Sequence, residues 1–432
     1  MNYKEAVDFI YSREMFANSS GFERIEALLK KLNCSEPKMK FIHVVGTNGK
    51  GSTSVMLANI LKEGGFKTGL FTSPFVTEFR ERIVLDGKYI EKEEFSKVVE
   101  KVRAACLEIE KEGLVPTFFE TVFASAILFY CENGCEIAVI EAGIGGKEDS
   151  TNIIPAPLAA VVTSVSFDHT AVLGNTLSEI AAAKSAVIKK GSIAVSFPRE
   201  NGGLDFVSQR PEVCAEIEKA AEKSSSRVFY PETEKVKDVV STLEKTSFKY
   251  KEKPYEIHFL GDHQIANAIT AITVAENLKS ELNLRDEDIQ LGLFKAFLPA
   301  RMEIVSKKPL VIIDGGHNEG CMKALSKMIS FHLKNKKITA LMGFMKDKDY
   351  KAALEIVAPD FENLVFTKAD GERGETAERL KKSAEGLCQN IFALNNQQEA
   401  FEKAMKLCGE DGVLICAGSF YLVSEIRKNF FV

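Results

Sequence analysis

A glycine-rich segment near the N-terminus has the residue types and the order that bind a polyphosphate. The apolar run at 41–45 leads directly into this loop and then into a helical pattern, as phosphate-binding loops require. Glycines let backbone N–H groups approach phosphate oxygens, Lys50 supplies a positive charge, and a hydroxyl from Ser52 or Thr53 can hold Mg²⁺. The predicted phosphate-binding residues are Gly46, Thr47, Asn48, Gly49, Lys50, Gly51, Ser52 and Thr53. The alternative is a glycine-rich turn that only caps a helix, and the lysine within the turn argues against it.

The loop departs from the general phosphate-binding spacing at two positions. Val44 stands where the first glycine would be, and Gly51 stands where Ser or Thr would follow the lysine. This departure points to one particular family.

Two further polar positions follow apolar runs that have the composition of buried strands. Glu141 closes the run at 136–142, and Asp168 with His169 follows the run at 158–165. Ligands bind beyond the carboxyl ends of strands in α/β sheets, so these side chains are candidates for the same site. The alternatives are a buried ion-pair partner for Glu141 and a capping or core histidine for His169.

Short apolar runs alternate with helical periodicity, which predicts an α/β fold with a central, mostly parallel sheet. The strands of the first series are predicted at 41–45, 68–72, 136–142, 158–165 and 192–196. The helices that should pack on them are predicted at 52–63, 119–133 and 177–188. A second series of strands is predicted at 309–317, 337–343, 363–367 and 412–419. The chain between 197 and 258 is polar and irregular, and we expect an α/β excursion there within the first domain.

The length of the chain predicts two domains. Its 432 residues exceed the ~250–300 residues at which one hydrophobic core stops growing. Pro299 breaks the helical pattern before the second series of strands, so we place the boundary there. The prediction is an N-terminal domain at 1–298 and a smaller, Rossmann-like α/β domain at 299–432.

Composition and charge argue against several classes of protein. The net charge of -5, without a run of like charges, does not favour nucleic-acid binding. The first sixteen residues lack the apolar centre of a secretory signal, and the most apolar window, 153–167, is too short for a membrane span and contains two prolines. Nine cysteines without CxxC spacing indicate reduced thiols. We therefore expect a soluble, cytoplasmic protein, and a monomer.

The glycine-rich segment GTNGKGST resembles the phosphate-binding loop of the Mur ligase superfamily. Its glycine after the lysine is the form seen in folylpolyglutamate and dihydrofolate synthases. Nine further blocks resemble that family in order along the chain: GFERIEALLKKL at 21–32, TSPFVTEFRERI at 72–83, TFFETVFASAILFY at 117–130, EAGIGGKEDSTN at 141–152, SFDHTAVLGNTLSEIAAAKSAVIKK at 166–190, LGDHQIANAITAI at 260–272, PARME at 299–303, IDGGHN at 313–318 and AGSFYLVSEIR at 417–427.

The resemblance implies a two-domain enzyme with a P-loop ATPase domain and a C-terminal Mur ligase-type domain. Its activity would be the ATP-driven addition of L-glutamate to dihydropteroate, to a reduced folate, or to both. An acyl phosphate would form on the carboxylate of the pterin substrate, the glutamate amine would attack it, and ADP and phosphate would leave.

The resemblance also implies two magnesium sites and an unusual lysine. The matching positions are Ser52, Ser73 and Glu141 for one ion, and His169 with Glu141 for the other. Lys184 matches a lysine that is carbamylated in this superfamily, which requires a neutral amine and therefore burial. Lys184 falls on the apolar face of the helix predicted at 177–188, whereas a surface lysine is the alternative. With Lys50, the residues Glu141, His169 and Lys184 form the implied catalytic set.

Nucleotide contacts are implied at five more positions. Gln264 and Asn267 match the adenine side, Arg301 matches a phosphate-binding arginine, and Asp314 and His317 match ribose and nucleotide contacts. Ordinary polar loop residues are the alternative for these positions. If the assignments hold, ATP lies between the two domains and their closure completes the site.

Some positions depart from the family pattern. Phe75 replaces a frequent histidine, Lys147 and Glu148 replace Arg-Leu, Ala183 replaces a common glutamate and Gly316 replaces the usual alanine. None of these differences removes a phosphate, metal or adenine contact expected of the family, and the resemblance therefore defines the pterin and glutamate subsites less well than the nucleotide site.

Two alternative functions remain open at this point. One is another Mur-type ligase that adds an amino acid to a cell-wall precursor, against which Gly51 and the SFYLVSEIR block argue. The other is a nucleotide-binding regulatory protein with no ligase activity. The choice between dihydropteroate and tetrahydrofolate, and the number and linkage of glutamates added, also remain open.

Overall fold

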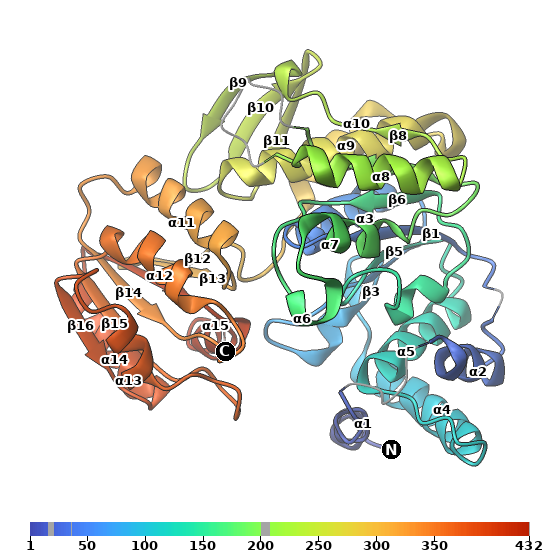
Figure 1. Ribbon diagram of the computed structural model, residues 1–432, viewed down its shortest axis with the longest axis horizontal. Coiled ribbons are helices and arrows are strands. Elements are labelled where there is room, and N and C mark those ends of the chain that lie inside the picture. The colour runs from blue at the N-terminus through green and yellow to red at the C-terminus, as the bar shows by residue number, and fades with distance from the viewer. Residues whose placement is uncertain (16–20, 36, 200–207, 432) are drawn as a thin grey trace. The chain divides into compact units, whose positions relative to one another are not determined.

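The protein is described by a computed structural model that covers residues 1–15, 21–35, 37–199 and 208–431 (Figure 1). Contacts divide the chain into two compact units. Unit 1 contains Met1–Val239, Ser247–Ile257 and Ile265–Phe297. Unit 2 contains Val240–Thr246, His258–Gln264 and Leu298–Val432. The units interleave between 240 and 264, and the assignment of domains 1–298 and 299–432 stays a prediction.

Unit 1 is built on an eight-stranded sheet in which the central strands are parallel. In spatial order the strands are β4 (Lys88–Tyr89), β3 (Ile83–Leu85), β2 (Thr68–Phe71), β5 (Ile137–Glu141), β1 (Lys40–Val45), β6 (Ala159–Val162), β7 (Ile193–Ser196) and β8 (Val228–Phe229). Among the described residues, only the pairs β2–β3 and β3–β4, at one edge, are antiparallel. The predicted mostly parallel sheet is confirmed.

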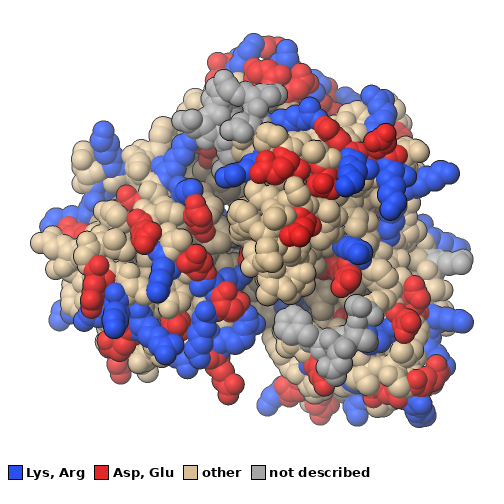
Figure 2. Space-filling view, viewed as in Figure 1, with Lys and Arg blue, Asp and Glu red and all other residues tan. Residues whose placement is uncertain are grey.

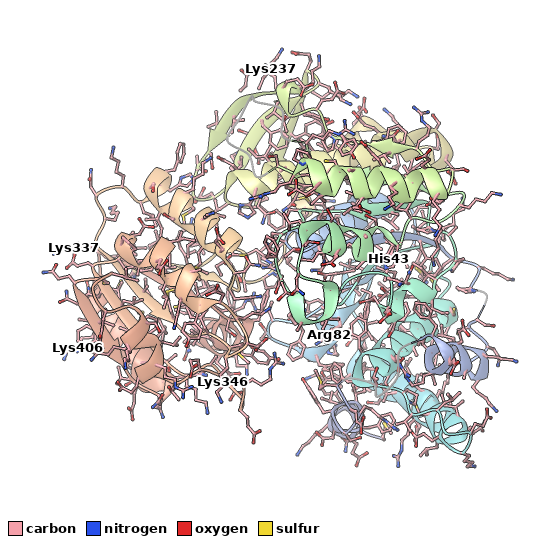
Figure 3. All side chains as sticks on the ribbon, viewed as in Figure 1. His43, Arg82, Lys237, Lys337, Lys346 and Lys406 are labelled. Atoms are coloured by element: carbon pink, nitrogen blue, oxygen red, sulfur yellow. The ribbon has the colours of Figure 1, made fainter. Side chains whose placement is uncertain are left out.

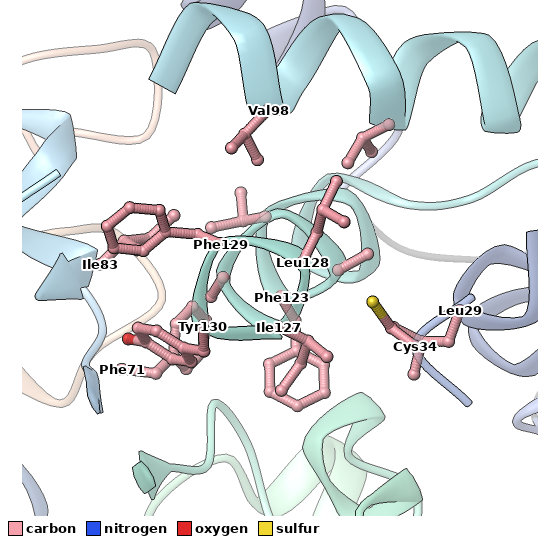
Figure 4. Packing of buried hydrophobic residues seen from close by; sticks show 14 of the residues in the cluster. Leu29, Cys34, Phe71, Ile83, Val98, Phe123, Ile127, Leu128, Phe129 and Tyr130 are labelled. Atoms are coloured by element: carbon pink, nitrogen blue, oxygen red, sulfur yellow. The ribbon is translucent and has the colours of Figure 1, made fainter. Parts of the chain in front are cut away.

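Helices cover this sheet because its strands are apolar on both faces. They are α1 (Tyr3–Tyr11), α2 (Glu23–Lys31), α3 (Lys50–Glu63), α4 (Lys92–Glu110), α5 (Phe118–Glu132), α6 (Thr170–Leu173), α7 (Leu177–Ser185), α8 (Pro211–Lys223), α9 (Asp262–Leu282) and α10 (Asp286–Lys295). Helix α5 lies in the middle of one core cluster (Figure 4), in which the Phe123 ring packs edge-on against Phe71 of β2. The buried Tyr130 hydroxyl donates to the Leu70 carbonyl at 2.7 Å, so this core also satisfies its polar atom.

Helix α7 ends at Ser185, three residues before the predicted end at Ile188. Beyond it, the Ile188 N–H reaches back only three residues, to the Ser185 carbonyl at 3.0 Å. Val187 and Ile188 are β-branched and buried in the core. Their stiff side chains favour this tight turn over another helical turn, which is why the apolar pattern continues after the helix has ended.

The segment at 197–258, predicted as an α/β excursion within the first domain, contains a helix and strands in its described residues. It holds α8, β8 and a separate three-stranded sheet of β9 (Val236–Ser241), β10 (Thr246–Tyr250) and β11 (Lys253–Ile257). Residues 240–246 of this segment belong to unit 2, so the excursion does not lie wholly within the first unit. The α/β character predicted for this segment is present. Its predicted placement within the first domain stays a prediction.

Unit 2 is a six-stranded sheet with the order β12-β13-β17-β14-β15-β16. The strands are β12 (Glu303–Lys307), β13 (Leu310–Asp314), β17 (Val413–Ala417), β14 (Ile338–Met342), β15 (Asn363–Phe366) and β16 (Asn390–Ala393). All but β12 run parallel. The helices are α11 (Glu319–His332), α12 (Tyr350–Val357), α13 (Ala377–Ser383), α14 (Gln397–Cys408) and α15 (Phe420–Lys428). This is the Rossmann-like arrangement expected for the C-terminal part.

The mixed charges of the surface and the free cysteines agree with what the composition predicts. Lysine and arginine side chains are interspersed with aspartate and glutamate on the face shown in Figure 2. All nine cysteines are free thiols. Among the described residues, no helix is long and apolar enough to cross a membrane.

Candidate functional site

The glycine-rich loop at 46–49 connects β1 to α3, as the sequence predicts. Gly49 has a left-handed φ of +86° and caps the N-terminus of α3. A Cβ atom on Gly46 would lie 1.9 Å from Thr163 Oγ1, and one on Gly49 would lie 2.3 Å from Asn267 Oδ1. Both positions therefore need glycine, and the first N–H groups of α3 point out of the loop as an anion site does.

The segment that follows β6 is hydrogen-bonded to the glycine-rich loop. The Thr47 N–H donates to the Ser164 carbonyl at 2.7 Å, and the Thr47 hydroxyl donates to the Ser166 carbonyl at 3.0 Å. The Ser166 N–H in turn donates to the same hydroxyl at 3.1 Å. The Thr47 side chain is thus committed to the protein, which leaves the glycines, the helix N-terminus and Lys50 to face a ligand.

The hydroxyl groups of α3 fit a phosphate or metal ligand. Ser52 is 3% exposed, and Thr53 is fully buried with no hydrogen-bond partner for its Oγ1 in the described structure. A buried hydroxyl without a partner in the first turn of a glycine-capped helix is available to a bound phosphate or metal ion. The Lys50 ammonium donates to the Thr47 carbonyl at 3.1 Å, so its charge lies over the loop.

Glu141 lies at the carboxyl end of β5, between the ends of β1 and β2. It pairs in register with Val44, and its Oε2 accepts the Ser73 N–H at 3.0 Å. Glu141 and Ser73 therefore meet, through the backbone of Ser73. Carboxylate and hydroxyl oxygens are the ligands that Mg²⁺ prefers. Within the described residues no group of three or more His, Cys, Asp or Glu side chains is gathered for a metal, so an ion here would also need hydroxyl, phosphate or water ligands.

His169 follows β6, the strand next to β1, in a left-handed conformation with φ of +49°. It caps the short helix α6, and its side chain is 37% exposed with Nε2 3.9 Å from Asp168 Oδ2. A positive φ is uncommon outside glycine, but histidine adopts it more often than most residues do. The site offers a histidine at this edge of the sheet, as predicted.

Lys184 is buried, as its place on the apolar face of α7 predicts, with 3% exposure. Its Nζ donates to the Gly46 carbonyl at 2.8 Å, which connects α7 to the phosphate-binding loop. Burial, together with the nearby charge of Lys50, lowers the pKa of Lys184 to about 7. A large fraction of this amine is therefore neutral near neutral pH.

The glycine-rich stretch after Glu141 packs directly on the backbone of Lys184. A Cβ atom on Gly146 would lie 2.7 Å from the Lys184 carbonyl oxygen, and the Lys147 N–H donates to the Ala183 carbonyl at 2.8 Å. Lys147 and Ala183, which both depart from the family pattern, thus contact each other through their backbones. Their side chains are not what joins the two segments.

A buried group of hydrogen-bonded polar side chains, which sequence reasoning missed, holds the stretch after Glu141. The Asp149 carboxylate accepts the Ile144 N–H at 2.7 Å and also the Thr151 N–H at 3.0 Å. His43, labelled in Figure 3, has its Nε2 2.9 Å from Thr151 Oγ1. Burial lowers the pKa of His43 to about 3, so the ring is neutral. A histidine inside the apolar run at 41–45 was the available signal.

Asn267 and Gln264 lie one turn apart on α9 and are both buried. Asn267 belongs to unit 1, where its Oδ1 faces Gly49. Gln264 belongs to unit 2. The structure therefore brings Asn267 to the phosphate-binding loop.

Unit 2 presents its own glycine-containing turn at the carboxyl end of β13. Asp314 closes that strand, and its carboxylate accepts the Met302 N–H at 2.9 Å and the Gly316 N–H at 2.7 Å. Burial raises the pKa of Asp314, and Arg301 opposes this shift. The carboxylate thus holds both the turn after β13 and the segment before β12.

Arg301 and His317 flank this turn. The Arg301 guanidinium lies 4.7 Å from the centroid of the Phe420 ring, in a cation–π arrangement. The His317 Nδ1 lies 3.2 Å from the Gly315 carbonyl oxygen. Gln264, Arg301, Asp314 and His317 therefore belong to unit 2, whereas the other predicted site residues belong to unit 1.

Family models match both parts of the chain. The Mur ligase middle domain matches residues 44–275, and the Mur ligase glutamate ligase domain matches residues 300–420. The chain is 31% identical to the dihydrofolate synthase/folylpolyglutamate synthase of Bacillus subtilis, with 99% of each chain covered. It is also 31% identical to the folylpolyglutamate synthase of Lacticaseibacillus casei, again with 99% of each covered. A solved complex of folylpolyglutamate synthase with AMPPCP and folate is 29% identical, with 100% of each chain covered and a TM-score of 0.85.

Proposed function

Because the chain belongs to the folylpolyglutamate synthase and dihydrofolate synthase family of the Mur ligases, we propose that its phosphate-binding loop drives amide formation between L-glutamate and a pterin carboxylate. The chain is an ATP-dependent ligase of this type. The acceptor is folate, dihydropteroate or both. The observation that carries the proposal is the loop at 46–49 and its two lysines. Lys50 donates a hydrogen bond to the Thr47 carbonyl, and Lys184 donates one to the Gly46 carbonyl.

The chemistry requires positive charge more than it requires a nucleophile. The γ-phosphoryl group passes from ATP to the acceptor carboxylate, which gives an acyl phosphate and ADP. The glutamate amine then attacks the acyl carbon, the amide bond forms, a proton is lost and phosphate leaves. Lys50 and the N–H groups at the start of α3 stabilise the charge on the transferred group.

Mg²⁺ would be held by oxygen ligands at the carboxyl edge of the unit 1 sheet. We assign Ser52, Ser73 and Glu141 to one ion, and Glu141 with His169 to the other. The hydroxyl of Ser52 and the carboxylate of Glu141 are oxygen ligands that suit such a site. A bound ion would neutralise charge between the nucleotide and the acceptor carboxylate.

Lys184 is proposed to be carbamylated. Its burial and its lowered pKa of about 7 supply the neutral amine that reacts with CO₂. A carbamate keeps one N–H group, so the bond to the Gly46 carbonyl can persist while an anion is added beside the metal ligands. Lys184→Ala should lose activity and regain it with short-chain carboxylic acids, and full activity in the untreated variant would refute the modification.

Nucleotide contacts are proposed for residues of both units. Asn267 is assigned to the adenine side because it faces Gly49, and Gln264 is assigned to the same side from its place one turn away on α9. Arg301 is assigned to a phosphate, and Asp314 and His317 are assigned to the ribose. We also propose a cytoplasmic location, which nine free thiols support, and a monomer.

The deciding experiment measures phosphate release by the purified protein with ATP and Mg²⁺. We expect release only when L-glutamate and either dihydropteroate or a reduced folate are both present, with product chain length read by mass spectrometry. A regulatory nucleotide-binding protein would hydrolyse ATP whether or not these substrates were added. Release that depends on a cell-wall precursor instead would assign the chain to the other branch of the Mur ligases.

A further inference from the structure

The four residues after β6 form the wall on which the phosphate-binding loop rests. On the side of the loop, the Thr163 N–H donates to the Val45 carbonyl at 2.8 Å, and the Ser164 carbonyl accepts the Thr47 N–H at 2.7 Å. Gly46 approaches Thr163 too closely to carry any side chain. The position of the segment 163–166 therefore sets the position of the loop.

On the other side of this wall, the pairing of β6 with β7 ends before the segment 163–166 begins. β7 pairs with β6 up to Ser196, and the Phe197 N–H makes the next bond, to the Val162 carbonyl at 2.8 Å. Among the described residues, the backbone bonds between β6 and β7 end there. The Thr163 carbonyl and the Val165 N–H lie beyond that end, and the described backbone supplies no partner for either of them.

Gln209 supplies both partners with its side chain. Its Oε1 accepts the Val165 N–H at 3.0 Å, and its Nε2 donates to the Thr163 carbonyl at 3.2 Å. The residue is 1% exposed, and its own N–H donates to the Pro198 carbonyl at 2.7 Å. A primary amide offers the same donor and acceptor as a peptide group, so this side chain replaces the missing strand at that point.

We propose that Gln209 is a positioning residue for nucleotide binding, which holds the segment 163–166 where the phosphate-binding loop needs it. The role rests on the proposed function, because it acts on the same loop. Without the amide, the buried Val165 N–H loses its partner, and the wall must shift or admit water. A shift there displaces Thr47 and with it the N–H groups that meet the phosphates.

The test replaces Gln209 with methionine, which has a similar length and no amide. AMPPCP binding, measured by calorimetry on the full chain, should weaken by about 10- to 100-fold, since small displacements of a site cost that much. The KM for ATP should rise by a similar factor while the KM for glutamate changes little. Hydrogen exchange should become faster in peptides that cover 46–49 and 163–166.

A matched control is Val213→Ala, in α8 a few residues from Gln209. Val213 is fully buried in the core and is not hydrogen-bonded through its side chain to the wall. This variant should unfold at a lower temperature but bind AMPPCP like the wild type. If Gln209→Met shows only that lower unfolding temperature, with wild-type affinity, the positioning role is overturned.

A second variant covers the case in which Gln209→Met does not fold. Gln209→Glu keeps the shape and the acceptor for Val165, but it sets an oxygen against the Thr163 carbonyl oxygen. Its affinity for AMPPCP should fall about tenfold, and unchanged affinity would contradict the role. Absence of AMPPCP binding by the wild-type chain would overturn the proposed function itself, and this role with it.

Discussion

The two parallel sheets of this chain each end in a glycine-containing turn, and the two turns are held by groups of opposite charge. In unit 1, lysines hold the backbone: Lys184 donates to the Gly46 carbonyl and Lys50 to the Thr47 carbonyl. In unit 2, the Asp314 carboxylate accepts the N–H groups of Met302 and Gly316. Cations at the first turn suit a triphosphate, and a carboxylate at the second suits the hydroxyls of a sugar. Similar folds thus offer different chemistry at the same sheet edge.

The largest effect should come from removing the charge over the first turn. Lys50→Ala is expected to lower kcat/KM for ATP on the order of 10²- to 10³-fold, because it removes a donor aimed at developing charge. Glutamate- and folate-dependent phosphate release measures this. Lys62→Ala, an exposed lysine later on the same helix, should leave the rate unchanged. A normal rate for Lys50→Ala would show that the first turn is not the phosphate site.

The next effect concerns the pH dependence of stability that Lys184 imposes. Its pKa is about 7 in the folded protein against 10.5 ordinarily, so between these values the unfolded chain carries a proton that the folded chain lacks. The free energy of unfolding should therefore rise with pH in this window, by up to ~1.4 kcal/mol per pH unit from this group. Urea unfolding at pH 7, 8 and 9, in buffers free of CO₂, should show this rise in the wild type relative to Lys184→Met. Parallel pH profiles would mean that Lys184 is charged when folded.

A smaller effect is expected at the second turn. Asp314→Asn keeps the shape but sets an amide N–H against one of the backbone N–H groups, so it should displace Gly316 or Met302. The expected result is about a tenfold rise in KM for ATP, which corresponds to one lost buried hydrogen bond. Asp411→Asn, an exposed carboxylate in the same unit, is the control. An unchanged KM for Asp314→Asn would remove this turn from the nucleotide site.

The smallest effect should come from Phe420, which lies under Arg301. Phe420→Leu removes the cation–π contact, worth ~0.5–1 kcal/mol at such a site, so the KM for ATP should rise about two- to fivefold. Tyr421→Leu changes the exposed neighbouring ring and should have no effect. Equal effects of the two substitutions would show that Arg301 does not depend on the Phe420 ring.

Much of the first turn could be predicted from sequence because its chemistry is local. The order of strand, glycines, lysine and helix lies within one short stretch, and the structure places β1, the loop and α3 there. The burial of Lys184 also followed from a local pattern, since its helix has one apolar face. The family implied the rest of the predicted set, and the roles of those residues stay predictions.

What could not be predicted depends on contacts between distant segments. Gln209 lies in the polar stretch at 197–258, and its amide has these partners only because the fold brings Thr163 and Val165 beside it. The left-handed turn at His169 and the early end of α7 at Ser185 were also not predicted, although the end of α7 has a local cause in the β-branched Val187 and Ile188. Periodicity reports which side of a helix is buried, and it does not report where a tight turn replaces the helix.

The close approach of Gly49 to Asn267 has a consequence for the gene. The two codons lie far apart, yet a side chain at one position would overlap the amide of the other. A chimera of two relatives with its crossover anywhere between them inherits the loop from one parent and its neighbour from the other. Recombination libraries built from this family should therefore recover functional offspring only when glycine and a residue of asparagine's size are kept together.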